Sequence, residues 1–183
     1  MQITVVRHTS VAVRKGTCYG WSDVPVAATF LQEAAATKQE LDAIIARQGC
    51  PFDAVFSSPL TRALLLADAC GYPDPIVDDR LKEMNMGCWE MRRYADIEQD
   101  DPQIHRWYRD YLHEPTTGGE SFPQFYLRVS AFYNELRLKP YRRVAIFAHG
   151  GVLICAGLYA GLFDEKGAWD HLVDFGGIER IEI

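Results

Sequence analysis

Two strand-like runs of the sequence each end in a histidine that is followed by small or turn-forming residues. Residues 3–6 lead into Arg7 and His8, and residues 144–148 lead into His149 and a pair of glycines. In an open α/β sheet, ligands bind in the crevice outside the carboxyl ends of the strands. If the two strands are neighbours, both imidazole rings project into one site.

The pattern of apolar residues predicts strands that alternate with helices along the chain. The expected strands cover about residues 2–7, 53–57, 75–78, 143–148 and 177–183. The expected helices cover about residues 29–48, 101–113, 122–138 and 151–161. A further helix is expected to open at Ser58, with the serine as N-cap and Pro59 at the first helical position. This alternation predicts an α/β fold, a three-layer sandwich in which a mainly parallel central sheet carries helices on both faces.

Residues 84–121 interrupt this alternation with a segment rich in aromatic and charged side chains. We interpret the segment as a lid-like insertion over the carboxyl edge of the sheet, forming part of a specificity wall. No internal repeat or linker indicates a second domain, so residues 1–183 are predicted to form a single domain.

The charge balance and the apolar runs limit the partners of the chain. A net charge of −6 argues against nucleic-acid binding, which needs a clustered basic face. Any anion pocket must therefore be a local concentration of arginine. The longest apolar stretches are shorter than the roughly 20 residues of a membrane-spanning helix, and residues 1–6 are too short for a signal-peptide core. The five cysteines are scattered, which argues against a disulfide framework or zinc site and favours a reducing cytoplasm.

Arg7 and His8 are residue types that phosphoryl transfer uses. A neutral imidazole can attack phosphorus, and the covalent intermediate splits one difficult displacement into two easier ones. The adjacent arginine offers a planar fork of donors that matches phosphate oxygens. The alternative is a surface Arg-His pair that closes an edge strand.

Arg62 and His149 are candidates to complete an anion pocket. Arg62 falls in the first turn of a helix that follows a strand, where the helix N-terminus adds backbone donors for an anion. Gly150 lets the backbone beside His149 approach a ligand closely. The alternatives are a solvated arginine and a histidine that serves packing alone.

A carboxyl group is needed to protonate the leaving alkoxide and later to activate water. Glu83 is the leading candidate for this role, and Glu90 is the second. Glutamates in such loops are often merely solvated, so the sequence leaves this alternative open.

Together these motifs resemble the histidine phosphatase superfamily, also called the phosphoglycerate mutase-like family, over essentially the whole chain. The resemblance rests on Arg7-His8, Ser57-Ser58-Pro59-Leu60-x-Arg62, Leu81-x-Glu83 with Gly87-x-Trp89-Glu90, Gly118-Gly119-Glu120-Ser121, and His149-Gly150-Gly151. The order and spacing of these motifs are specific as a set.

The resemblance implies a role for each of the candidate residues. His8 would accept the phosphoryl group as a phosphohistidine, and Glu83 would donate a proton and then act as the base for water. Arg7, Arg62 and His149 would line the phosphate pocket with His8 and stabilise the transition state. No metal or other cofactor is expected.

The sequence also departs from the family's commonest motifs, and the departures narrow the substrate. Where the family's commonest motif reads Arg-His-Gly-Glu, this chain has Thr9 and Ser10 in the last two positions. Where the family usually has Trp-Glu-Gly, this chain has Met91 in place of the glycine. Arg-His-Thr followed by Cys-Tyr-Gly-x-x-Asp-Val-Pro resembles the α-ribazole phosphatase branch, although the second string is also a good turn former. The substrate-binding residues that this resemblance implies are Thr9, Thr17, Tyr19, Gly20 and Gly150.

The function that the resemblance implies is a metal-independent phosphomonoesterase that acts on α-ribazole 5′-phosphate, or on the 5′-phosphorylated cobalamin precursor, in cobalamin biosynthesis. The alternatives are a broad-specificity phosphatase for small metabolites, a phosphoglycerate mutase-type phosphotransferase and a non-catalytic binding homologue. The expected partner is a small phosphorylated metabolite, and a homodimer is compatible with the sequence.

Aromatic residues in the 84–121 segment admit two interpretations. His105, Trp107, Tyr108 and Tyr111 can stack on a benzimidazole-type base, because flat aromatic faces suit such a ligand. Alternatively, they form an amphipathic helix that packs its aromatic face on the sheet, and this second interpretation is the more common outcome for such a pattern.

Overall fold

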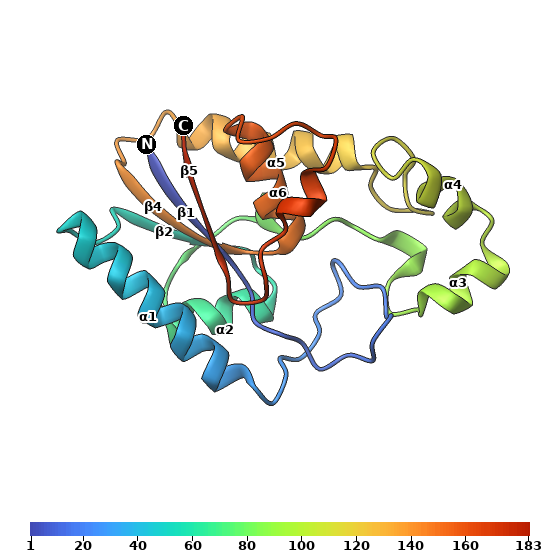
Figure 1. Cartoon of the computed structure of the whole chain (residues 1–183), viewed down its shortest axis with the longest axis horizontal. Coiled ribbons are helices and arrows are strands. Elements are labelled where there is room, and N and C mark those ends of the chain that lie inside the picture. Colours follow the sequence, from blue (N-terminus) through green and yellow to red (C-terminus); the bar gives the residue numbers. More distant parts are fainter.

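A five-stranded sheet runs through the molecule and carries helices on both faces (Figure 1). The computed structural model describes residues 1–183. The strands are β1 (Gln2–Arg7), β2 (Ala54–Ser57), β3 (Ile76–Val77), β4 (Arg143–Ala148) and β5 (Ile178–Glu182), and their order in the sheet is β3-β2-β4-β1-β5. Only β5 runs antiparallel to its neighbour. The predicted α/β fold with a mainly parallel sheet is confirmed.

Two apolar clusters, one on each face of the sheet, hold the helices in place. The helices are α1 (Phe30–Gln48), α2 (Thr61–Ala69), α3 (Tyr94–Asp100), α4 (Gln103–Arg109), α5 (Phe122–Leu136) and α6 (Gly150–Tyr159). Because side chains alternate along a strand, Ala145 and Phe147 of β4 pack with α1 and α2, whereas Val144 and Ile146 pack with α5 and α6. The central strands are therefore buried on both faces, which explains their continuous apolar runs.

The start of α2 differs from the prediction. The helix begins at Thr61 with Leu60 as its N-cap, and Ser58 is not a cap. The Ser58 hydroxyl lies 2.8 Å from Nε2 of His149, and a carboxylate oxygen of Asp23 accepts the Thr61 N–H at 3.0 Å. A residue distant in the sequence therefore caps the helix, and the first N–H of α2 is not free for an anion.

The predicted helix over residues 101–113 is also shorter than expected, because α4 covers only Gln103–Arg109 and a separate helix, α3, precedes it. Asp101 separates the two helices. Its carboxylate accepts the Gln103 N–H at 3.0 Å and the indole N–H of the buried Trp89 at 2.7 Å. This pair of bonds anchors the junction on the core.

Residues 84–121 contain α3 and α4, which lie at one end of the molecule, far from both chain termini (Figure 1). Movement of this segment as a lid remains a prediction. None of the helices in the molecule combines the length and the apolar composition that crossing a lipid bilayer requires.

Candidate active site

The pairing of β1 with β4 brings His8 and His149 together. The two strands are parallel neighbours, with Arg7 opposite Ala148, and the His8 N–H donates to the Ala148 carbonyl at 3.0 Å. Each histidine follows the last residue of its strand, so both rings lie at the same edge of the sheet. The ring centroids are 5.2 Å apart and both side chains are buried.

His8 is held in a single tautomer by its neighbour in the chain. Its Nδ1 lies 2.7 Å from the Thr9 carbonyl oxygen, which can only accept, so Nδ1 carries the hydrogen. Burial, followed by the charges of Arg62 and Arg7, lowers the pKa of His8 to about 3. The ring is therefore neutral at neutral pH, and its Nε2 presents a lone pair, which is the form a nucleophile requires.

His149 completes the pair from the other strand. Its Nε2 lies 2.8 Å from the Ser58 hydroxyl, whereas its buried Nδ1 has no partner. Burial, with the charge of Arg62 as the next cause, holds the pKa of His149 well below 6.5. A hydroxyl that donates to Nε2 leaves Nδ1 as a free N–H donor.

Backbone carbonyl groups hold the two arginines of the site. Arg7 donates from a terminal nitrogen to the Val173 carbonyl at 2.5 Å. Arg62, which is fully buried, donates to the carbonyl oxygens of Gly20 at 2.7 Å and Ser22 at 2.9 Å. These contacts orient the guanidinium groups without neutralising them, so their positive charge stays available to an anion.

Several buried donors around His8 have no partner. Arg7 Nε, Arg62 Nε, His149 Nδ1 and the Thr9 hydroxyl are all inaccessible to solvent and make no hydrogen bond. Leaving such a group unsatisfied costs about 1–3 kcal/mol each. A concentration of unsatisfied donors beside two arginines is the expected state of an anion site before its ligand binds.

Glu83 reaches the same region from the loop that follows β3. Its two carboxylate oxygens accept the N–H groups of Met84 at 2.9 Å and Gly151 at 3.1 Å, the latter at the N-terminus of α6. A Cβ at Gly151 would lie 2.3 Å from Glu83 Oε1, so only glycine leaves room for this contact. The sequence does not assign this role to Gly151.

Glu90, the second candidate for proton transfer, serves a different purpose. Its carboxylate accepts the backbone N–H groups of Gly20, Trp21 and Ser22 at 2.8–3.1 Å. Burial raises the pKa of Glu90, but these hydrogen bonds outweigh that effect and the pKa lies below its ordinary value. Glu90 is thus a persistent anion that fixes the loop whose carbonyl groups bind Arg62.

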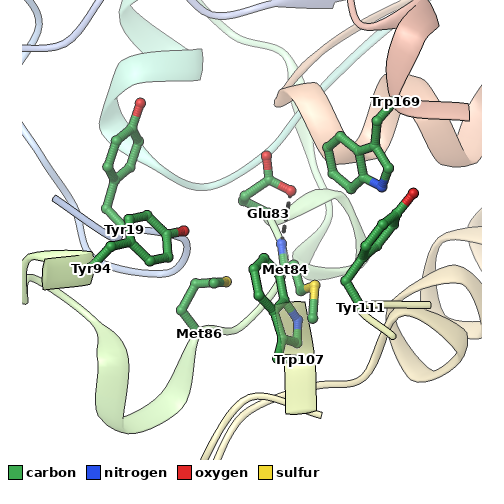
Figure 2. A pocket seen from close by; sticks show the side chains of 8 residues that line it. All are labelled: Tyr19, Glu83, Met84, Met86, Tyr94, Trp107, Tyr111 and Trp169. Atoms are coloured by element: carbon green, nitrogen blue, oxygen red, sulfur yellow. Dashed lines mark hydrogen bonds between the residues drawn. The ribbon is translucent and has the colours of Figure 1, made fainter. Parts of the chain in front are cut away.

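An aromatic cavity of about 360 Å³ is lined in part by Glu83. Figure 2 shows its lining, with Tyr19 and Tyr94 across from Tyr111 and Trp169, and Glu83 between them. The other lining residues are Met84, Met86 and Trp107. The ring centroid of Tyr19 lies 5.5 Å from Cζ of Arg62. Tyr19 therefore connects the aromatic cavity to the cationic pocket formed by Arg7 and Arg62, and Glu83 lies at the same junction.

The other residues predicted to bind substrate do not all lie at the cavity. The Gly20 carbonyl accepts a hydrogen bond from Arg62. Gly150 packs against the Arg7 side chain, because a Cβ added at Gly150 would lie 3.3 Å from Arg7 Nε. Thr17 is bridged to Arg93 and does not line the cavity. Of the four residues of the 84–121 segment that were candidates for stacking on a base, Trp107 and Tyr111 line the cavity, whereas Tyr108 and His105 are exposed.

Comparison with known proteins finds similar sequences and similar folds. The model of the histidine phosphatase superfamily (branch 1) matches residues 3–183. The crystal structure of the α-ribazole phosphatase from Shigella flexneri has a TM-score of 0.87 and 28% identity, and the match covers 100% of this chain and 91% of that chain. A provisional α-ribazole-5′-P phosphatase from Escherichia coli has a TM-score of 0.85 and 27% identity, over 98% and 89% of the two chains.

A curated relative is a provisional phosphoserine phosphatase from Hydrogenobacter thermophilus. It is 30% identical over 139 residues, which are 72% of this chain and 66% of that protein. The chain thus matches slightly less than two thirds of the length of this relative.

The two buried neutral histidines predict that acid destabilises the fold. The pKa values of His8 and His149 are depressed in the folded chain, whereas both groups titrate near 6.5 when unfolded. As pH falls from about 6.5 to about 5, the unfolded state binds more protons, and the free energy of unfolding falls by about 1.4 kcal/mol per pH unit for each histidine.

Denaturant unfolding of the wild type and of His8→Asn across this pH range measures the effect. The slope of the free energy of unfolding against pH should be smaller for His8→Asn by the contribution of one histidine, about 1.4 kcal/mol per pH unit. Substitution of the exposed His113, which only pairs with Asp110, should not flatten it. Equal slopes for wild type and His8→Asn would contradict the prediction.

The contacts of Glu90 predict a defect in anion binding. In Glu90→Gln, an amide replaces one of the oxygens that accept backbone N–H groups, so the loop that holds Arg62 loses its anchor. Hydrogen bonds to charged groups contribute about 1.5–3 kcal/mol, so inorganic phosphate should bind about tenfold more weakly or worse. Calorimetric titration measures this, with Glu98→Gln, which affects only the exposed bond to Tyr108, as the matched control. Equal affinity in both variants would show that Glu90 does not support the site.

Proposed function

The chain belongs to the histidine phosphatase superfamily (branch 1). We propose that it is a phosphatase that hydrolyses α-ribazole 5′-phosphate, or the 5′-phosphorylated cobalamin precursor, through a phosphohistidine. The observation that supports this substrate is the aromatic cavity that adjoins the cationic pocket. Membership of the family and the similarity to named phosphatases support phosphomonoester hydrolysis as the reaction.

The cationic pocket would bind the phosphate group first. The unpartnered donors of Arg7, Arg62 and His149 match the need of phosphate oxygens for hydrogen bonds. His8 Nε2 would then attack phosphorus, forming an N–P bond as the ester P–O bond breaks. The fixed arginines stabilise the charge on the equatorial oxygens during this transfer, which is the main task of a phosphoryl-transfer site. Arginine donors can fill this role without a metal ion.

Glu83 is the group proposed to handle the proton. As the ester bond breaks, the carboxyl group gives its proton to the leaving oxygen, which departs as an alcohol. The resulting carboxylate then takes a proton from water as the water oxygen attacks phosphorus. The N–P bond breaks, inorganic phosphate forms, and His8 returns to its neutral state.

The aromatic cavity would receive the leaving group. Its walls are Tyr, Trp and Met side chains, and Glu83 is its only carboxylate. A flat, uncharged aromatic base fits such walls better than the charged serine or glycerate part of the alternative substrates, because desolvating a charge is costly. This difference favours α-ribazole 5′-phosphate over phosphoserine and phosphoglycerate.

The proposed mechanism predicts that His8→Ala loses hydrolysis by about a thousandfold or more, because the covalent route is removed. The fold should persist. Rapid quenching of the wild type with ³²P-labelled substrate should trap an acid-labile phosphoprotein that is missing in His8→Ala. His113→Ala, which changes an exposed histidine, is the control and should keep full activity. A labelled His8→Ala protein would overturn the assignment of the nucleophile.

The proposed substrate predicts a clear order in a panel of phosphate esters. The kcat/KM for α-ribazole 5′-phosphate should exceed those for ribose 5-phosphate, phosphoserine and phosphoglycerate by about a hundredfold, or ~2.7 kcal/mol. Tyr111→Ala should reduce this preference by lowering kcat/KM for the ribazole ester and not for ribose 5-phosphate. Tyr108→Ala, on the solvent face of α4, is the matched control. Similar kcat/KM values across the panel would contradict the proposed substrate and indicate a broad-specificity phosphatase instead.

A further inference from the structure

Arg128, in the middle of α5, uses every hydrogen-bond donor of its guanidinium group. Its Nε and one terminal nitrogen donate to the two carboxylate oxygens of Glu120 at 2.8 and 2.7 Å. Its other bonds go to the backbone carbonyl oxygens of Arg80, Lys82 and Glu83 at 2.9, 3.0 and 3.1 Å. Five N–H groups thus meet five acceptors, and three of the acceptors belong to the loop that carries Glu83.

Glu120 extends this network to the other side of the same loop. Its Oε2 also accepts the Asn85 N–H at 2.8 Å. The loop is therefore held on both sides of Glu83, by Arg128 before it and by Glu120 after it. The Arg128–Glu120 pair is largely buried, so solvent screens it little. This pair also gives a structural purpose to Glu120 in the Gly118-Gly119-Glu120-Ser121 motif.

Aromatic contacts fix the plane of the guanidinium group. Arg128 lies 5.0 Å from the centroid of Phe125 and 5.8 Å from that of Trp21. The Trp21 indole N–H donates to the Glu83 carbonyl at 2.7 Å, so this single oxygen accepts from both Trp21 and Arg128. The backbone of Glu83 is thus fixed by two side chains from distant segments.

We propose that Arg128 is a positioning residue that aligns the Glu83 carboxyl group for proton transfer to the leaving oxygen. The inference rests on the proposed role of Glu83 as proton donor. Proton transfer requires hydrogen-bond distance to the leaving oxygen, and a loop held at three carbonyl groups keeps the carboxyl group there. Lysine cannot replace Arg128, because its ammonium group has three donors and no planar fork.

Two esters with different leaving groups distinguish a role of Arg128 in positioning the acid from a general role in stabilising the fold. 4-Nitrophenolate leaves without a proton, whereas the alkoxide of α-ribazole needs one. Arg128→Lys should lower kcat/KM for α-ribazole 5′-phosphate by about tenfold or more and leave kcat/KM for 4-nitrophenyl phosphate within about threefold, given that general acid catalysis contributes about 10²–10⁴-fold. The ratio kcat/KM is compared because it reports phosphoryl transfer to His8 and not the later attack of water, which both esters share. Arg137→Lys, at the end of the same helix, is the matched control.

A double-substitution cycle with Glu83→Gln completes the test. If Arg128 acts through the Glu83 carboxyl group, Arg128→Lys should have little further effect in the Glu83→Gln protein. An equal loss for both esters, or the same loss in both backgrounds, would overturn the inference while Glu83→Gln alone still showed the leaving-group dependence. Uniform loss in Glu83→Gln itself would overturn the proposed proton donor as well. Glu120→Gln, which keeps the side-chain shape, replaces Arg128→Lys if that variant does not fold.

Discussion

Backbone carbonyl oxygens hold the two arginines of the site, and the rest of the active site depends on this choice of partner. A carboxylate in the same position would neutralise a guanidinium group and weaken its attraction for an anion. Carbonyl groups from residues 20–22 and from Val173 orient Arg62 and Arg7 without cancelling their charge. That charge in turn helps to keep His8 neutral, the form in which it can attack phosphorus. A chain of net charge −6 thereby builds a cationic pocket from two arginines and its own backbone dipoles.

The parts of the site that depend on strand order could be predicted from the sequence. The runs before His8 and His149 are apolar enough for central strands, and parallel strands bring their carboxyl ends to one edge of a sheet. The sequence ranks Glu83 above Glu90 as the proton donor but does not exclude Glu90, because both lie in the same segment after β3. Only the fold shows that the Glu90 carboxylate is already occupied by N–H groups from much earlier in the chain.

Local sequence rules failed at the start of α2, where residues distant in the sequence meet. Ser58 followed by Pro59 has the composition of a helix start, and an N-cap contributes about 1 kcal/mol. A buried His149 Nε2 without a partner would cost about 1–3 kcal/mol. The Ser58 hydroxyl lies against the histidine, and its oxygen also accepts the Leu60 N–H at 3.3 Å, just before the helix begins. Asp23 accepts the Thr61 N–H, so the predicted free helix N-terminus is missing beside Arg62.

Chemistry and substrate selection reside in different parts of this chain. The groups proposed to act on phosphorus follow β1, β2 and β4 and are fixed by the sheet, whereas most of the cavity wall comes from the 84–121 segment and from Trp169 before β5. Substitutions in those two segments can change the alcohol that fits without moving a phosphate donor. Glu83 belongs to both parts, because it lines the cavity and bonds to the N-terminus of α6. Its backbone must therefore stay fixed while the cavity walls vary, and the five bonds of Arg128, a residue outside both the sheet and the cavity, meet that requirement.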